Sequence, residues 1–321
     1  MTLLIREAEV RALLTMPLAL EAVEDSLRKQ AAGQFVVHER HRLKLPGNAF
    51  LHYMAAGDAA GGYIGMKLYT SVAGSLTFLV TLYSAANGKL VALIEAGALG
   101  QIRTGAASGV ATKYLARKDA RTAAIIGTGY QAWSQAEAIA AVRPIERIRA
   151  FGRDPERRAA FCRKMSERLH IEVTPASSGE EAVRGADIVI TATTAMKTVL
   201  EGAWLSSGVH INAIGANFPQ KRELDDAAVA RAGLICTDSI EQSKMESGDL
   251  IQAFGADASR WKTVHELADV VAGKAPGRTS AEQVTLFKSN GIASWDVAAA
   301  ERVFELATAR GIGQKLSMWE T

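Results

Sequence analysis

The chain has 321 residues, of which 48% are hydrophobic and 22% are charged, so it is long enough for two globular domains. Its net charge of +3 is too small to indicate a nucleic-acid-binding surface. Cys162 and Cys236 lie far apart and lack metal-ligand spacing, which favours a reducing compartment. No apolar run approaches the ~18 residues of a membrane span, and the first residues lack a signal-peptide core. We therefore expect a cytoplasmic protein that binds neither membranes nor nucleic acid.

The N-terminal part predicts a helix followed by a mainly antiparallel sheet. Apolar residues recur at helical spacing from Pro17 to Ala32. Basic residues then cluster at His38, Arg40, His41, Arg42 and Lys44. Strand-like runs follow at Phe50–Met54, Tyr63–Tyr69, Leu76–Tyr83 and Leu90–Ile94. Asn87-Gly88, between the last two runs, is typical of a hairpin turn.

The rest of the chain alternates between strands and helices. A helix of small residues, Gln101–Leu115, opens with Arg103-Thr104-Gly105 and is the expected bridge between two domains. Strands are then expected at Ala123–Ile126, Ile148–Phe151, Ile171–Pro175, Ile188–Ala192, His210–Ile214 and Leu234–Thr237. This rhythm predicts an α/β fold with a Rossmann-type, doubly wound parallel sheet. A last helix, Trp295–Ala309, is expected to pack back on the N-terminal region.

A glycine-rich turn follows the first of these strands. The sequence Gly127-Thr128-Gly129-Tyr130-Gln131-Ala132 has the Gly-x-Gly-x-x-Ala spacing of a dinucleotide-binding turn. Gly127 permits the tight turn, Gly129 leaves no side chain between the backbone and a pyrophosphate, and Ala132 lets the helix pack close to the strand. The helix N-terminus then faces the phosphates.

The end of the second strand usually selects between NAD and NADP. Gly152 leaves the usual acidic position empty, and Arg153 would suit a 2′-phosphate. Asp154 could instead reach a ribose hydroxyl, or cap the helix that begins at Pro155. The sequence leaves the cofactor open between NADP(H) and NAD(H).

Three basic residues need a partner if they are buried: Arg42, Lys67 and Arg103. Lys67 lies in an apolar run, where it is either an interior lysine of adjustable pKa or a solvent-facing strand residue. Arg103 opens its predicted helix, against the dipole preference, which indicates an anionic partner unless it is an ordinary surface arginine. The sequence His38-Glu39-Arg40-His41 lacks further ligands at suitable spacing, so no metal site is expected.

Several stretches, in order along almost the whole chain, resemble the ornithine cyclodeaminase and μ-crystallin family. They are Gly65-Met66-Lys67, Gly100–Ala106, Gly127–Ala132, Ile211–Asn217, Arg222-Glu223-Leu224-Asp225 and Val284–Gly291. The resemblance implies a substrate-binding and dimerisation domain from residues 1–115 with 296–321, and a Rossmann domain from residues 116–295. It also implies a homodimer and NAD(P)-dependent chemistry on imines or amines of 2-amino acids.

The resemblance places Arg42, Lys67 and Arg103 at the substrate, with Lys67 as the catalytic residue. Cofactor contacts are expected from the turn Gly127, Gly129, Tyr130, Gln131 and Ala132, and from Thr104, Arg153, Thr193, Gly215, Asn217, Lys221 and Ser289. Cyclodeaminases of the family carry an aspartate where this chain has Asn217, and an amide cannot accept a proton as a carboxylate does.

We therefore expect a reversible NAD(P)H-dependent reductase of a small 2-imino acid, with iminosuccinate, iminopyruvate or a cyclic ketimine as substrate. An ornithine cyclodeaminase and a non-catalytic protein that binds NADP and a small ligand are the alternatives. If Arg40 points the same way as Arg42, the pair favours a dicarboxylate; otherwise the site suits alanine-sized substrates.

Overall fold

The computed structural model describes residues 1–318 and divides into two compact units. Unit 1 is Met1–Thr104 with Gly291–Thr321, and unit 2 is Gly105–Asn290. The sequence placed the boundaries at residues 115 and 296 instead. The first boundary differs because it lies inside one continuous helix, α3 (Gly97–Leu115), where the sequence carries no turn signal.

Unit 1 is built on an eight-stranded sheet in the order β16-β1-β7-β6-β5-β4-β2, with β3 also paired to β4. The paired strands are antiparallel except for β1 with β7, so the predicted mainly antiparallel sheet is confirmed. The strands are β1 (Thr2–Ile5), β2 (Phe35–Val37), β3 (His41–Leu45), β4 (Ala49–Asp58), β5 (Tyr63–Val72), β6 (Ser75–Ser84), β7 (Leu90–Glu95) and β16 (Gln314–Leu316).

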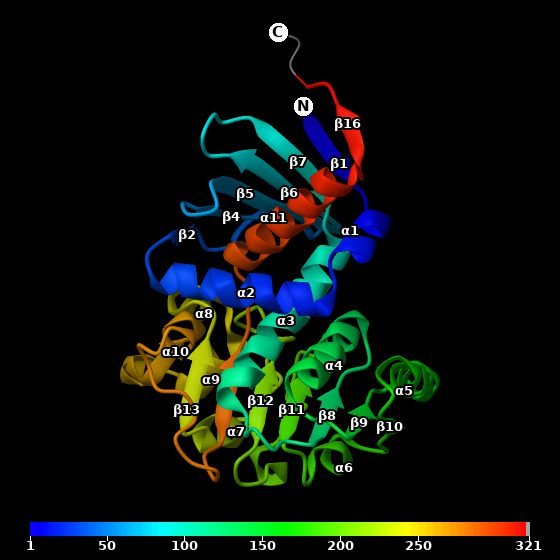
Figure 1. Cartoon of the computed structure of the whole chain (residues 1–321). Coiled ribbons are helices and arrows are strands. Elements are labelled where there is room, and N and C mark those ends of the chain that lie inside the picture. Colours follow the sequence, from blue (N-terminus) through cyan, green and yellow to red (C-terminus); the bar gives the residue numbers. More distant parts are fainter. Residues whose placement is uncertain (319–321) are drawn as a thin grey trace. The chain divides into compact units, whose positions relative to one another are not determined.

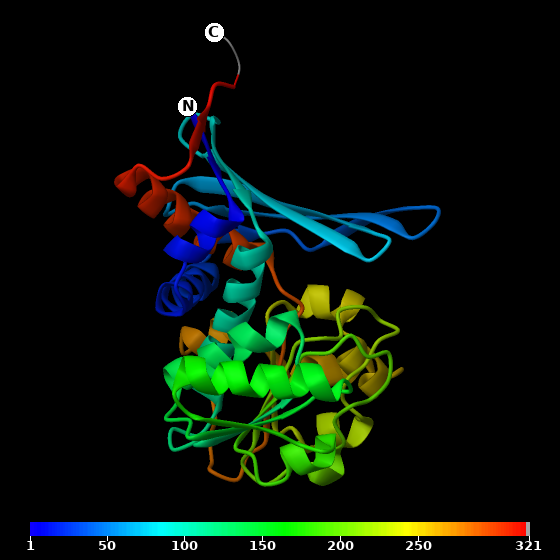
Figure 2. The same ribbon diagram turned by 90° about the vertical axis from the view of Figure 1, so that its right-hand side faces the viewer.

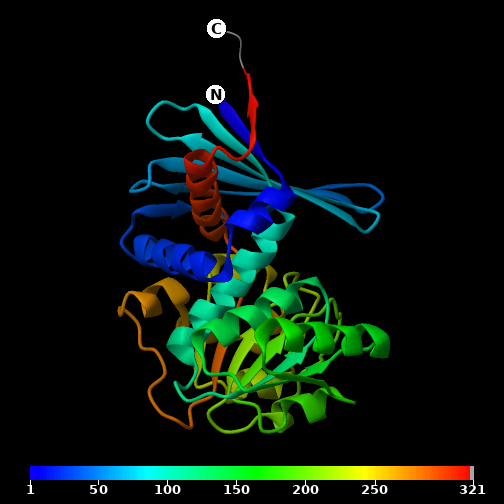
Figure 3. The ribbon, with the colours of Figure 1, turned by 45° about the vertical axis from the view of Figure 1, so that its right-hand side comes forward.

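Helices from both ends of the chain cover one face of this sheet (Figures 1 and 3). They are α1 (Glu7–Leu13), α2 (Met16–Ala31) and α11 (Ala293–Arg310). The register places Met54, Lys67 and Val80 opposite one another on neighbouring strands, and all three are buried on the helix-covered face. The expected return of the last helix to the N-terminal region is therefore confirmed.

The other face of the unit 1 sheet is apolar and partly exposed. Tyr53 lies opposite Leu68, and Leu68 lies opposite Leu79, so these side chains share this face. Tyr53 is 37% exposed, and Leu43, one position along the same face, is 51% exposed. The hairpins β3–β4 and β5–β6 extend away from helices α2 and α11 (Figure 2).

Unit 2 contains an eight-stranded sheet in which every paired strand is parallel, in the order β10-β9-β8-β11-β12-β15-β13-β14. The strands are β8 (Thr122–Ile126), β9 (Arg147–Phe151), β10 (Glu172–Pro175), β11 (Ile188–Thr191), β12 (His210–Ala213), β13 (Leu234–Thr237), β14 (Val264–Glu266) and β15 (Thr285–Lys288). The six strands predicted for this part of the chain correspond to β8–β13, and their bounds agree to within one residue at each end. Strands β14 and β15 were not predicted.

Alternate residues of the parallel strands enter two separate cores. Ala124, Ile126 and Val189 belong to one core, while Ala123 and Ile125 belong to the other, so both faces of the sheet are covered. The helices are α4 (Tyr130–Val142), α5 (Pro155–Leu169), α6 (Gly179–Val183), α7 (Asp226–Arg231), α8 (Ile240–Glu246), α9 (Gly248–Phe254) and α10 (Leu267–Val271), with 3-10 turns at Gly202–Trp204 and Ala258–Thr263. The predicted Rossmann fold is confirmed. Among residues 1–318, none of the helices is long and apolar enough to cross a membrane.

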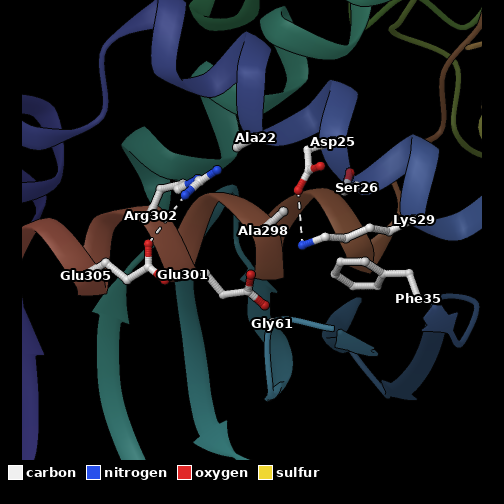
Figure 4. A pocket seen from close by; sticks show the side chains of 10 residues that line it. All are labelled: Ala22, Asp25, Ser26, Lys29, Phe35, Gly61, Ala298, Glu301, Arg302 and Glu305. Atoms are coloured by element: carbon white, nitrogen blue, oxygen red, sulfur yellow. Dashed lines mark ion pairs between the residues drawn. The ribbon is translucent and has the colours of Figure 1, made fainter. Parts of the chain in front are cut away.

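A small cavity of about 70 Å³ in unit 1 lies between α2, α11 and the turn at Gly61 (Figure 4). Lys29 Nζ forms ion pairs with Asp25 at 3.0 Å and Asp58 at 2.7 Å. Glu301 lines the cavity and is 7% exposed, and its Oε1 has no hydrogen-bond partner within the described residues. Burial, reinforced by Asp58, raises the pKa of Glu301 to about 8. Glu301 is therefore mostly protonated at neutral pH, and the cavity is not the predicted substrate site.

The raised pKa of Glu301 leads us to predict that this residue lowers the free energy of unfolding as the pH rises. Because the pKa is about 8 in the folded chain and about 4.3 in the unfolded chain, the folded state binds the proton more tightly. The free energy of unfolding should therefore fall, relative to Glu301→Gln, as the pH rises from 5 to 9. Urea denaturation of both proteins across this range measures the difference. Glu167→Gln, at an exposed position away from the cavity, is the control, and parallel profiles for wild type and Glu301→Gln would contradict the prediction.

Candidate active site

Three charged side chains of unit 1 meet in a buried cluster. Lys67 Nζ donates to Asp296 Oδ1 at 2.7 Å, and Arg103 Nε donates to the same oxygen at 2.9 Å. Lys67 and Arg103 are each 4% exposed and Asp296 is fully buried. Lys67 comes from the middle of β5, Arg103 from α3, and Asp296 from the first turn of α11.

This geometry decides two alternatives that the sequence left open. Lys67 lies on the helix-covered face of the sheet and does not face solvent. Arg103 lies in the second turn of α3, since that helix begins at Gly97, so the prediction that Arg103 opens the helix is wrong. The expected anionic partner of Arg103 exists, and it is Asp296.

Burial and neighbouring charges set the protonation of the cluster. Burial lowers the pKa of Lys67 to about 8, although the nearby Asp296 carboxylate acts in the opposite direction. Burial by itself would raise the pKa of Asp296, but Arg103 and Lys67 outweigh it and hold that pKa below its usual value. At neutral pH the cluster therefore contains an ionised carboxylate and a charged lysine that releases its proton near pH 8.

The cluster also has unused hydrogen-bonding capacity. Arg103 Nη1 and Asp296 Oδ2 are buried, and neither has a hydrogen-bond partner among residues 1–318. Buried polar atoms are nearly always paired, so orphaned atoms of opposite character indicate that a ligand completes the site. An arginine N–H matches a carboxylate oxygen in charge and geometry.

The remaining predicted substrate residue, Arg42, belongs to the same face of the sheet. Arg42 lies opposite His52 across β3 and β4, and His52 stacks on Tyr69 with ring centroids 4.2 Å apart. Burial, then the charges of Arg42 and Arg40, lower the pKa of His52 to about 4, so this imidazole stays neutral. Arg40 is buried, donates to the Gly291 carbonyl at 3.0 Å and lies 3.9 Å from Met54 Sδ.

Sequence reasoning missed Asp296. The signal was present, because Asp296 is an acidic residue inside the small, apolar stretch Trp295–Ala300 of α11. A carboxylate buried in such a helix requires a cationic partner. The partner could not be identified without the fold, since Lys67 and Asp296 are 229 positions apart in the chain.

In unit 2, the glycine-rich turn has the geometry of a pyrophosphate site. Gly127 has a φ of +108°, and a Cβ there would lie 2.3 Å from the Ala192 carbonyl oxygen. A Cβ at Gly129 would meet no atom of the described chain within 4 Å, so it would project into open space. Gly129 is the N-cap of α4 and, as a glycine, has no side chain that could cap the helix, while Ala132 is fully buried against the sheet. These features fit a bound phosphate at the N-terminus of α4.

The order of strands reverses beside this turn, because β8 lies between β9 and β11. Ligands of doubly wound sheets bind at such a switch point. The predicted residues Thr193 and Gly215 follow β11 and β12 there, and a Cβ at Gly215 would lie 2.3 Å from the Thr193 carbonyl oxygen. The structure thus brings Gly127, Thr193 and Gly215 together.

The other predicted cofactor residues are more scattered, and their roles stay predictions. Ser289 is buried and its hydroxyl donates to Asp238 at 3.3 Å. Asn217 and Lys221 lie in the loop after β12, with Lys221 Nζ 5.1 Å from the Phe218 ring centre. Thr104 belongs to unit 1, where its hydroxyl donates to the Gly100 carbonyl at 2.7 Å.

At the end of β9, Asp154 is the N-cap of α5. Its carboxylate accepts from the N–H groups of Glu156 and Arg157, both at 3.0 Å. Gly152 has no room for an acidic side chain, since a Cβ would lie 2.4 Å from Thr128 Oγ1. Arg153 is exposed in the same turn. Asp154 is engaged as a helix cap and Arg153 is the basic residue nearest a possible 2′-phosphate, so the choice between NADP(H) and NAD(H) stays a prediction.

The model of the ornithine cyclodeaminase/mu-crystallin family matches residues 1–311. This chain belongs to that family. It is 40% identical to a Δ¹-pyrroline-2-carboxylate reductase of Bacillus cereus over 230 residues, which cover 71% of this chain and 70% of the relative. Its fold matches Δ¹-pyrroline-2-carboxylate reductase of Thermococcus litoralis in complex with NADH and L-proline, with a TM-score of 0.94, 34% identity and coverage of 98% and 100%. It also matches an archaeal alanine dehydrogenase dimer with bound NAD, with a TM-score of 0.93, 33% identity and coverage of 99% of both chains.

These similarities confirm the family and the fold expected from the sequence. The relatives are oxidoreductases of the expected kind, because they are named for an imine or an amino acid and two were solved with NAD or NADH.

The position of Arg153 in the turn after β9 allows the choice between NADP(H) and NAD(H) to be tested. Arg153→Ala should weaken NADPH binding by about 1.5–3 kcal/mol, as expected for a lost charged hydrogen bond, and leave NADH binding unchanged. Fluorescence titration of both cofactors measures this. Arg157→Ala is the control, because Arg157 is also exposed but contacts Asp154 at 3.4 Å. Equal losses for NADPH and NADH, or a wild type that prefers NADH, would contradict the binding of a 2′-phosphate by Arg153.

Proposed function

We propose that this protein is an NAD(P)H-dependent oxidoreductase that reduces a small 2-imino acid to the L-amino acid, reversibly. The observation that carries this proposal is the buried Lys67–Asp296–Arg103 cluster, which pairs a proton donor of pKa about 8 with an arginine N–H that lacks a partner among residues 1–318.

Each residue of the cluster has a distinct role. Arg103, together with Arg42, binds the α-carboxylate of the substrate. Lys67 donates its Nζ proton to the imine nitrogen, which receives the electron pair of the C=N bond as hydride adds to the carbon. Asp296 keeps Lys67 in its charged form and fixes the ammonium and the guanidinium at one oxygen. The product is the amine, and solvent reprotonates Lys67.

A nicotinamide cofactor, when bound, supplies the hydride. The residues proposed to hold it are the turn Gly127, Gly129, Tyr130, Gln131 and Ala132, with Thr104, Arg153, Thr193, Gly215, Asn217, Lys221 and Ser289. The open space at Gly129 and the phosphate-compatible N-terminus of α4 support this assignment.

Among the substrates considered, a dicarboxylate such as iminosuccinate is favoured. Arg42 lies opposite His52, and Arg40 lies against Met54, two positions along the same face of β4. A dicarboxylate required Arg40 to point the same way as Arg42, and the two arginines lie on the same face of the sheet. A second carboxylate would find a positive group beside the one that binds the first.

A cyclodeaminase is the weaker alternative. Ring closure needs a base for the side-chain amine, and Asn217, which stands at the position of the family's aspartate, cannot accept a proton.

We further propose that the protein is a homodimer formed through the uncovered face of the unit 1 sheet. The apolar row Tyr53, Leu68 and Leu79 supports a second copy as its occupant, and so does the dimeric state of the similar alanine dehydrogenase. A reducing, cytoplasmic location is also proposed, since both cysteines are buried free thiols.

A substrate panel tests the catalytic proposal. Oxaloacetate or pyruvate with ammonium, Δ¹-pyrroline-2-carboxylate, and ornithine alone are each mixed with NADH or NADPH. We expect net oxidation of the reduced cofactor, with a kcat/KM for oxaloacetate about ten- to a hundredfold above that for pyruvate, the effect of one charge pair. Lys67→Met should lower kcat by roughly a hundredfold or more, because the general acid is lost, and should leave cofactor binding intact.

Proline formed from ornithine without net redox change would instead identify a cyclodeaminase. Cofactor binding without turnover of any substrate would identify a binding protein. Wild-type turnover by Lys67→Met would remove Lys67 from its catalytic role.

The dimer proposal has its own test. Tyr53→Glu should convert the dimer to a monomer in sedimentation velocity, because an exposed tyrosine on the apolar face becomes a charge. Met245→Glu is the control, since Met245 is 52% exposed on α8 of unit 2. A monomeric wild type, or a Tyr53→Glu dimer as stable as the wild type, would exclude this interface.

A further inference from the structure

One buried carboxylate joins the ends of two neighbouring strands in unit 2. Glu223 lies in the loop before α7 and is fully buried. Its Oε1 accepts hydrogen bonds from the N–H and the hydroxyl of Thr193, both at 2.7 Å. Its Oε2 accepts from the Thr191 hydroxyl at 2.8 Å and from the Gly215 N–H at 2.7 Å. Glu223 therefore ties the end of β11 to the end of β12.

These contacts require a carboxylate of this length. Two main-chain N–H groups point at opposite oxygens, and an amide in place of the carboxylate would present its NH₂ group to one of them. The Ala195 N–H donates to Thr193 Oγ1 at 3.0 Å, which directs the Thr193 hydroxyl proton toward Glu223. The space is also closed, since a Cβ at Gly215 would lie 2.5 Å from Glu223 Oε1.

Glu223 belongs to a larger buried group of charges. Asp249 Oδ1 accepts from the N–H groups of Glu223 at 2.6 Å and Leu224 at 2.9 Å. Lys288 Nζ lies 3.5 Å from Asp249 Oδ2 and donates to the Ala213 carbonyl at 3.3 Å. Glu223, Asp249 and Lys288 are all fully buried, and two carboxylates accompany one ammonium.

The protonation of Glu223 follows from its donors. Burial and the neighbouring Asp249 raise the pKa of Glu223 above its usual value, although Thr193, Lys288 and Thr191 act in the opposite direction. Both oxygens accept a main-chain N–H in addition to a hydroxyl, which is the environment of an ionised carboxylate. The carboxylates of Glu223 and Asp249 and the ammonium of Lys288 then carry a net negative charge.

We propose that Glu223 is a positioning residue for the nicotinamide half of the cofactor, and that its negative charge favours the oxidised, cationic ring over the reduced, neutral ring. This inference rests on the proposed function. In a doubly wound sheet the dinucleotide lies across the carboxyl ends of the strands at the switch point. With the pyrophosphate at the Gly127 turn after β8, the second half of the cofactor lies toward β11 and β12, whose ends Glu223 joins.

The test compares cofactor binding by Glu223→Gln and Glu223→Asp. Dissociation constants for the oxidised and reduced forms are measured by calorimetry, using whichever of NAD(H) or NADP(H) the wild type binds. Glu223→Gln should weaken both forms by about tenfold, since one main-chain N–H loses its acceptor, and should weaken the oxidised form by about tenfold more because the charge is lost. Glu223→Asp keeps the charge but is too short to bond both strands, so both forms should weaken while their ratio stays that of the wild type.

Thr191→Val is the matched control. It removes one hydroxyl donor from the same carboxylate and keeps the charge, so the ratio of the two dissociation constants should not change. Melting temperatures of all variants separate loss of folding from loss of binding.

Folded variants that bind both forms as the wild type does would overturn the proposal, and so would an unchanged ratio in Glu223→Gln. Failure of both Glu223 variants to fold would also overturn it, because the carboxylate would then hold the fold and not the cofactor. A wild type that binds neither NAD(H) nor NADP(H) would refute the proposed function itself, which separates the two failures.

Discussion

The candidate chemistry of this protein depends on a single buried carboxylate, Asp296, that holds two cations at one oxygen. Taking a lysine, an arginine and an aspartate out of water is costly, and removal of one partner from a buried pair typically costs about 3–5 kcal/mol. The cost is tolerated only where the three groups satisfy one another. The same burial lowers the pKa of Lys67 to about 8 against the opposing effect of Asp296, so the environment that makes the cluster necessary also prepares a proton donor.

This cluster explains why both ends of the chain build one unit. Asp296 comes from the last helix, Lys67 from a central strand of the N-terminal sheet, and Arg103 from the helix that follows that sheet. Helix α11 packs on β4, β5 and β6 and on α2, so its apolar face supplies the core while its first turn supplies the acid. Packing and chemistry therefore depend on the same element.

In unit 2 the candidate site is held in place by hydrogen bonds to the backbone and not by a cluster of charged side chains. The candidate cofactor site is formed by backbone, at Gly127, Gly129 and Gly215, where side chains would collide or fill the space. Buried polar groups then hold the backbone, with Glu223 accepting the N–H groups of Thr193 and Gly215. A site formed by backbone binds through its N–H groups and dipoles, and buried hydrogen bonds hold those groups in place.

The sequence by itself determined what depends on local pattern. Strand β13 (Leu234–Thr237) and the start of helix α5 at Pro155 were predicted to the residue, because short apolar runs and a capping Asp154-Pro155 pair are local signals. The glycine turn at Gly127 was also readable from its spacing, whereas the substrate role of Lys67 came from the resemblance and stays a prediction. The tertiary structure alone decided which groups meet. Asp296 could not be matched to Lys67, nor Glu223 to Thr193 and Gly215, because hydrogen bonds between separate elements and loops leave no periodicity in the chain. The boundary inside α3 and the uncovered face of the sheet were hidden for the same reason, since a helix and a strand have the same local pattern whatever lies against them.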